Sequence, residues 1–188
     1  VFALGAPQSN YRSERSDSEL SPKLGVDFKL TDDVMLYAQY SAGFKSGGFD
    51  MRGNATVFPG TVNGYKPESV DNYEVGLRST VFDGRLRFNA TVFYADYTDV
   101  QVTTQQFVTV MGVPTNATAV LNAGKQVNQG AEIETVWQPV DAFTLSTSIG
   151  YLDAEFKEFF ASNPASPGTI VNFASVTPVI NAPDWTFA

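Results

Sequence analysis

The sequence predicts an all-β protein and, within that class, a segment of an antiparallel transmembrane β-barrel. Three observations predict it: apolar and polar residues alternate along long stretches, short turns and long segments alternate between those stretches, and aromatic residues gather at both stretch ends. The stretches run for roughly 11–14 residues, against about 5–6 for strands of globular proteins. Membrane barrels combine such alternation with short periplasmic turns and long extracellular loops.

Composition leaves membrane barrels and soluble globular proteins as the two classes to separate. Hydrophobic residues make up 43% of the 188 residues, which excludes disorder, and aromatic residues make up 13%, which favours β-structure. Charged residues are only 17%, below the roughly 25% of typical soluble domains. The chain has no apolar run of 18 residues, so no transmembrane helix is expected.

The charge and the missing residue types exclude several functions. A formal net charge of −8, with 12 scattered basic residues, argues against nucleic acid as a partner. The absence of Cys excludes disulfides and thiolate chemistry, and the absence of His removes the commonest general base and metal ligand. We therefore expect no enzyme activity, no catalytic or metal-ligating residues and no cofactor.

Alternation places six strands, and the faces of each strand follow from its pattern. In the third strand Tyr73, Val75 and Leu77 form one face, whereas Glu74 and Arg78 belong to the other. A seventh strand is expected to start in the closing run "DWTFA". The six strands are expected at residues 23–30, 34–45, 72–81, 86–94, 131–137 and 143–151.

Short turns set the pairing of these strands in three hairpins. A two-residue type I′ turn at Asp83-Gly84 brings apolar residues opposite each other, as do a three-residue loop at 31–33 and a five-residue loop at 138–142. The predicted pairs are Leu30 with Val34, Phe28 with Leu36, Val81 with Leu86, Leu77 with Ala90, and Trp137 with Phe143.

The other connections are long and lie at residues 46–67, 107–124 and 158–183, where Gly, Pro, Asn, Ser and Thr are frequent. Because they recur at every second connection, all of them emerge at one end of the sheet, as extracellular loops do. Aromatic residues near both strand ends indicate interfacial belts. They are Phe28, Phe82, Trp137 and Phe143 near the turns, and Tyr40, Phe44, Tyr94, Tyr97, Tyr151 and Phe156 near the loops.

Several segments together resemble the TonB-dependent outer-membrane receptors. The motifs "YKPES", "NYEVGLR", "DGRL", "GAEIE" and "NAPDWTF" occur in the order usual for that family, and the similar segments cover most of residues 20–188. The resemblance implies a 22-stranded barrel in the outer membrane of a Gram-negative bacterium. Residues 1–188 would supply about six to seven strands of this single barrel domain, whose plug domain and remaining strands are absent from the chain.

The resemblance also implies a function and partners. Such a receptor takes up a ferric siderophore or another scarce small-molecule nutrient, with energy from the TonB complex acting through the missing N-terminal part. Membrane lipid and lipopolysaccharide would surround the barrel, and a plug domain of the same polypeptide would fill it. A passive porin or structural barrel, and a soluble β-sheet protein that binds a ligand, are the alternatives.

Two sets of candidate site residues follow. Phe49 and Arg52, in the glycine-rich loop after the second strand, offer an apolar surface and a cation to an anionic, partly aromatic ligand. Charged residues on the polar faces of the strands are expected to face the lumen, where they contact a plug or line the substrate route. These lumenal candidates are Glu74, Arg78, Arg87, Glu132 and Glu134.

Overall fold

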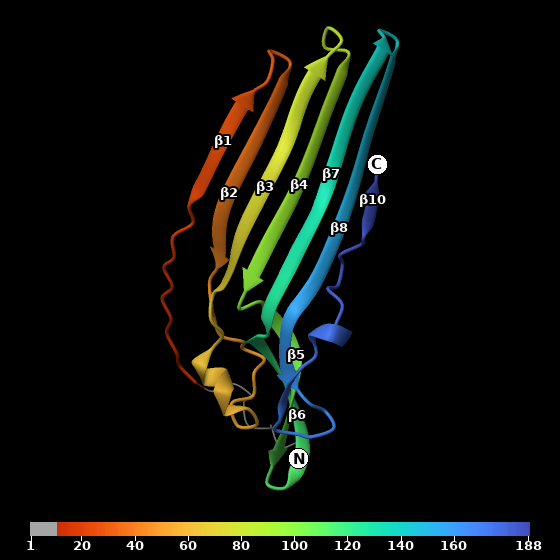
Figure 1. Ribbon diagram of the computed structural model, residues 1–188. Coiled ribbons are helices and arrows are strands. Elements are labelled where there is room, and N and C mark those ends of the chain that lie inside the picture. Colours follow the sequence, from red (N-terminus) through yellow and green to blue (C-terminus); the bar gives the residue numbers. More distant parts are fainter. Residues whose placement is uncertain (1–10) are drawn as a thin grey trace.

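The computed structural model describes residues 11–188, which form one long, curved antiparallel sheet with a cluster of loops at one end (Figure 1). The prediction of an antiparallel barrel wall is confirmed, and between its outer strands the described sheet is open. Its strands, in spatial order, are β1 (Lys23–Lys29), β2 (Val34–Lys45), β3 (Glu68–Val81), β4 (Leu86–Thr98), β7 (Gly124–Val140), β8 (Phe143–Ser162) and β10 (Trp185–Phe187).

The remaining elements lie at the end of the sheet where the long connections emerge, called here the loop end; the opposite end is the turn end. β5 (Gln101–Val110) and β6 (Val113–Asn122) form a separate hairpin, and β9 (Ile170–Asn172) pairs with the last residues of β8. Two short 3-10 helices, η1 (Pro59–Asn63) and η2 (Ala174–Val176), complete the loops. In the described part of the chain, no helix is long and apolar enough to cross a membrane.

Alternation gives the sheet an apolar face and a polar face. Leu77, Ala90 and Ile133 lie side by side in one register row of the apolar face. Val75 and Val92 remain 54% and 55% exposed there, although both are mid-strand valines, because no described element covers that face. Near the loop end the same face carries an aromatic cluster, with 5.2 Å between the ring centroids of Tyr40 and Tyr73.

Two predicted aromatic positions do not belong to this belt. Tyr97 pairs with Val70 and Gln126, and Phe156 also pairs with Gln126, so both follow the alternation of the polar face. Both lie near the loop end, as predicted, but they belong to the polar face, whereas an interfacial belt lies on the apolar face.

The first two predicted registers are confirmed. Phe28 lies opposite Leu36, and Val81 lies opposite Leu86. The turn between β3 and β4 has positive φ at Asp83 (54°) and Gly84 (83°), as a type I′ turn requires, and the amide of Arg85 donates to the carbonyl of Phe82 (3.0 Å).

The third predicted register is wrong by two residues. Trp137 lies opposite Leu145 rather than Phe143, and Val140 takes the place opposite Phe143. Pro139 lacks the N–H that a ladder needs, so the strand is irregular between Trp137 and Val140 and then continues to a tight turn. A shift of two residues keeps the apolar face intact, which is why the alternation could not reveal the error.

The predicted irregular loop at 107–124 is also wrong, because most of it belongs to the β5–β6 hairpin. Its turn, Met111-Gly112, has positive φ at both residues (50° and 81°). Methionine is unusual in such a turn, where Asn or Asp precedes Gly in the strongest sequence signal. Within 158–183, β8 extends to Ser162, which lengthens the strand beyond the sequence expectation.

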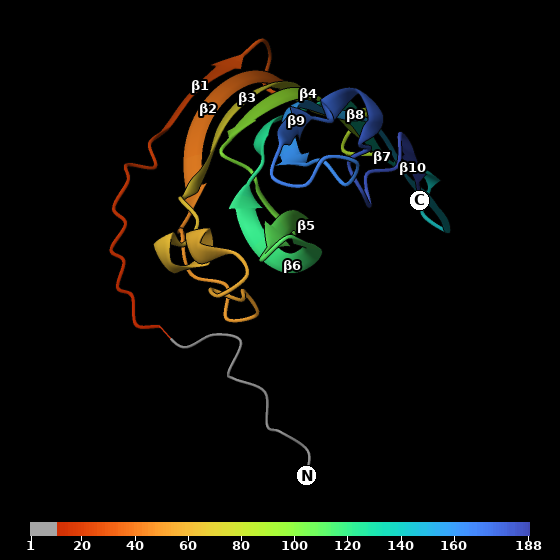
Figure 2. The same ribbon diagram turned by 90° about the horizontal axis from the view of Figure 1, so that it is seen from below.

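The buried core of the described chain lies at the loop end, where the β5–β6 hairpin occupies the inside of the curved sheet (Figure 2). Most of its apolar members are alanines, whose small side chains allow the hairpin to approach β8 closely. The buried apolar residues are Ala95, Val100, Ala117, Ala119, Ala123, Val127 and Ala161.

Candidate functional site: a charged sheet face and a loop junction

The five lumenal candidates lie on the polar face of the sheet. Arg78 and Arg87, from β3 and β4, and Glu132 and Glu134, from β7, line one open hollow near the turn end. Glu74 lies closer to the loop end, two polar-face positions along β3 from Arg78. It contacts the hollow through Tyr37, which also lines it. The structure therefore brings together residues that are separated by up to about sixty positions in the sequence, as strands at 4.7–4.9 Å spacing allow.

Tyr37 is the residue that sequence reasoning missed on this face. Its hydroxyl donates to Glu74 Oε1 (2.6 Å) and lies 3.0 Å from Thr91 Oγ1. The guanidinium carbon of Arg78 lies 4.8 Å from the centre of the Tyr37 ring, within cation–π range. An aromatic residue on the polar side of a strand, with glycine (Gly76) on the neighbouring strand, was the signal that could have revealed it.

The charged groups of the polar face remain without ionic partners among the described residues. None of the five ion pairs in residues 11–188 includes a lumenal candidate. Glu134 accepts a long hydrogen bond from Asn89 Nδ2 (3.4 Å), and Arg78 lies against the Tyr37 ring. The face thus presents carboxylates and guanidinium groups that an apposed polar surface could bind.

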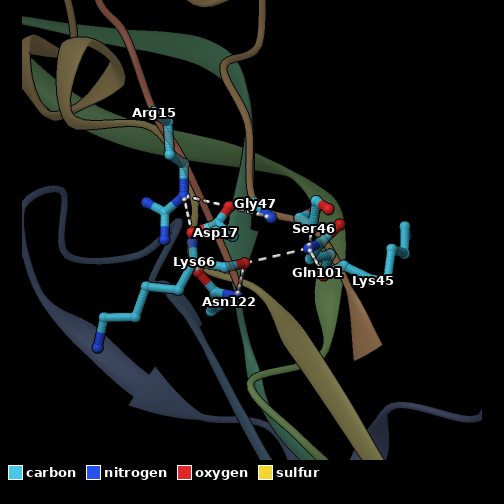
Figure 3. Close-up of polar contacts among 8 residues, drawn as sticks. All are labelled: Arg15, Asp17, Lys45, Ser46, Gly47, Lys66, Gln101 and Asn122. Atoms are coloured by element: carbon cyan, nitrogen blue, oxygen red, sulfur yellow. Dashed lines mark hydrogen bonds and ion pairs between the residues drawn. The ribbon is translucent and has the colours of Figure 1, made fainter. Parts of the chain in front are cut away.

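The second feature is a junction of three loop segments at the loop end (Figure 3). Asp17, in the segment before β1, accepts hydrogen bonds from Arg15 Nε (2.8 Å) and from the amide of Gly47 (3.0 Å). Gly47 permits this contact because a Cβ there would overlap both Arg15 Nε and the carbonyl of Tyr65. The segment before β1 is therefore fastened to the loop after β2.

The β5–β6 hairpin is fastened to the same loop by two side-chain amides. Gln101 Nε2 donates to the carbonyls of Ser46 (3.0 Å) and Lys66 (3.1 Å). Asn122 accepts from the amide of Lys66 (2.7 Å) and donates to its carbonyl (2.9 Å), which imitates a backbone ladder (Figure 3). No titratable side chain contributes to these two links, so sequence reasoning that followed charged residues missed them.

Phe49 and Arg52 lie within this assembly and do not form one free surface. Phe49 is half-buried with its ring edge-to-face against Tyr11, 6.5 Å between centroids. The Arg52 side chain is 60% exposed, but its guanidinium donates to both carboxylate oxygens of Asp50 (3.0 and 3.1 Å). Asp50, with a side chain only 7% exposed, is a site residue that the sequence did not indicate.

Two carboxylates of the loop assembly have lowered pKa values. The hydrogen bond from Arg15 is the main cause that lowers the pKa of Asp17 below 3.8. Burial by itself raises the pKa of Asp50, but the hydrogen bonds and charge of Arg52, with the backbone amides of Arg52 and Val120, outweigh burial and lower it. Both groups therefore remain ionised in the folded loops.

Fold and site together define a segment of an outer-membrane β-barrel wall, with an apolar outer face, a charged inner face and structured loops at one end. The family model described as "TonB dependent receptor-like, beta-barrel" matches residues 3–188. The chain belongs to this family, and it is part of a Gram-negative outer-membrane protein.

Individual relatives agree with this assignment. The metal-pseudopaline receptor CntO of Pseudomonas aeruginosa is 28% identical over 144 residues, which cover 76% of this chain and 18% of that protein. The ferric yersiniabactin uptake receptor FyuA of Yersinia pestis has the same fold, with a TM-score of 0.57 and 22% identity over 88% of this chain and 21% of that structure. The alcaligin outer-membrane receptor FauA of Bordetella pertussis also has this fold, with a TM-score of 0.55 and 19% identity. The match covers 93% of this chain and 26% of that structure.

Proposed function

We propose that the full-length protein is an active-transport receptor that takes up a metal ion complexed by a small organic chelator, with energy from the TonB complex. The family match over residues 3–188 is the observation that carries this proposal. The chain spans about a fifth of the length of the relatives it matches, and their names refer to metal-pseudopaline and ferric yersiniabactin. A ferric siderophore is the first substrate to test, and we propose transport without a catalytic step.

The polar face supports a second part of the proposal, in which residues 1–188 belong to one barrel domain whose N-terminal plug domain lies against this face. Glu74, Arg78, Arg87, Glu132 and Glu134 face the lumen in this arrangement. A charged face without ionic partners among the described residues is what an apposed polar domain would complement. A passive pore would use the same charges only to hold water.

The loop junction supports a third part, the place of ligand entry. Arg52 is exposed over more than half of its side chain, and Asp50, Phe49 and Tyr11 hold its loop in place. We propose that Arg52 contacts an anionic chelate, whereas Phe49 positions the loop. Arg52→Ala should weaken ligand binding, while Arg12→Ala, which removes a fully exposed cation of the preceding segment, should not.

Direct binding tests the proposal. The full-length protein, purified in detergent, is titrated with a panel of ferric siderophores, with the same siderophores free of metal and with the metal salts alone, and tryptophan fluorescence is recorded. We expect saturable binding of at least one metal complex in preference to its metal-free form. Absence of saturable binding across catecholate, hydroxamate and carboxylate complexes would contradict a metal-chelate receptor.

A further inference from the structure

Tyr37 lies between a carboxylate, Glu74, and a guanidinium, Arg78, on the polar face. Glu74, Gly76 and Arg78 are successive residues on that face of β3, and Tyr37 of β2 is the register partner of Gly76. Its ring fills the space above this glycine, where a Cβ would overlap ring atoms. The aromatic ring thus stands where β3 carries no side chain, with Glu74 toward the loop end and Arg78 toward the turn end.

The two ends of the tyrosine contact the two charged residues differently. Tyr37 has a single hydroxyl proton, which goes to the Glu74 carboxylate (2.6 Å), so the hydroxyl of Thr91 donates to Tyr37 (3.0 Å) in turn. This chain of hydrogen bonds, from β4 through β2 to β3, fixes one carboxylate oxygen. The ring face fixes Arg78, whose guanidinium lies over it at 4.8 Å.

Without the ring, the Glu74 carboxylate and the Arg78 guanidinium could form an ion pair with each other. Four residues of strand separate their Cα atoms by about 13 Å, which extended Glu and Arg side chains can bridge above a bare glycine. In the described chain neither residue belongs to an ion pair. The ring blocks the direct path, and its two contacts hold the charges on opposite sides.

We propose that Tyr37 is a positioning residue whose hydroxyl holds the Glu74 carboxylate away from Arg78, so that both charged groups can bind the plug domain. This inference rests on the proposed function of the polar face. Glu74 retains acceptor sites for a cationic or N–H donor group, and Arg78 retains N–H donors for a carboxylate or carbonyl. The apposed segment of the plug therefore presents a donor toward the loop end and an acceptor toward the turn end.

The test measures amide hydrogen exchange of the plug domain in the full-length protein. Tyr37→Phe keeps the ring above Gly76 and removes only the hydroxyl, so β2 and β3 should keep their exchange rates. Plug peptides that contact the wall should exchange about fivefold faster or more, the effect of one weakened charge-assisted hydrogen bond. Tyr40→Phe is the matched control, because Tyr40 donates to Asp71 at 2.6 Å between the same two strands but on the apolar face.

A double-mutant cycle separates this inference from the function on which it rests. Tyr37 acts through Glu74, so Tyr37→Phe combined with Glu74→Gln should give the exchange of Glu74→Gln alone. If Glu74→Gln leaves plug exchange unchanged, the proposed contact between wall and plug is wrong. If Glu74→Gln accelerates plug exchange but Tyr37→Phe does not, or if Tyr37→Phe accelerates β2 and β3 instead, the positioning role is wrong and the plug contact stands.

Discussion

Ser162, at the end of β8, holds Phe107 of β5 through both backbone groups of that residue. The Ser162 hydroxyl donates to the carbonyl of Phe107 (3.0 Å) and accepts from its amide (3.0 Å). Ser162 is 4% exposed, so these bonds are shielded from water. One hydroxyl thus closes the outer edge of the β5–β6 hairpin against the barrel wall.

Ser162→Ala should loosen the hairpin, because it leaves the amide of Phe107 without its partner, at a cost of about 1–3 kcal/mol. Amide exchange over residues 101–122 of the full-length protein should rise about tenfold or more, whereas the mid-strand amides of β4 and β7 should not change. Ser166→Ala, at an exposed position of the following loop, is the control. Equal exchange in both variants would show that other contacts hold the hairpin.

Gly47→Ala should open the junction of Figure 3, since its Cβ would overlap Arg15 Nε and the carbonyl of Tyr65. We expect faster cleavage by trypsin at Arg12 and Arg15 in the full-length protein, because the segment before β1 would detach. Gly43→Ala provides the comparison, as its Cβ would make an ordinary 3.5 Å contact with Val70. Unchanged cleavage after Gly47→Ala would mean that Asp17 does not fasten this segment.

Neighbouring residues of β8 should respond oppositely to a new charge. Ile149 lies on the apolar face and Ser148 on the polar face. An arginine on the lipid side near the bilayer midplane costs about 2–4 kcal/mol, whereas a lumenal arginine stays hydrated. Ile149→Arg should therefore reduce the amount of folded, heat-modifiable protein in outer membranes, and Ser148→Arg should not. Equal losses would contradict the assignment of the faces.

Acid should release the loop assembly. Asp17 and Asp50 have folded pKa values below 3.8, so their stabilising contribution is complete above about pH 4 and is lost as the pH falls through the folded values. A spin label at the exposed Thr56→Cys should be equally mobile from pH 7 to about pH 4 and more mobile below it. Asp50→Asn should increase mobility at neutral pH and flatten this dependence. A transition near pH 6 would point to other groups.

The alternation of residues was sufficient to predict the wall. In β3 and β4 the turn chemistry of Asp83-Gly84 and the apolar pattern agree, so strand, face and register were all predictable. At Pro139 the alternation no longer determines the register, because a bulge displaces the pairing by two residues without changing either face.

The loop end was less predictable for physical reasons. The segment from Val100 to Gly124 has no charged residue, and its Thr, Gln and Val residues do not separate clearly into two faces. The partners of Gln101, Asn122 and Ser162 are mainly backbone groups of distant segments, which leave no pattern in the sequence. Tyr37 could have been found from its polar-face position, but its contacts with Glu74 and Arg78 required the register of β2 against β3.

Uptake of a radiolabelled ferric siderophore by whole cells tests energy-dependent transport most directly. The measurement compares cells that produce the full-length protein as the only receptor for that complex, with the TonB complex intact or deleted, after binding has identified the ligand. We expect accumulation only when the TonB complex is intact, with surface binding preserved in both strains. Equal accumulation in both strains would contradict active transport and favour a passive pore.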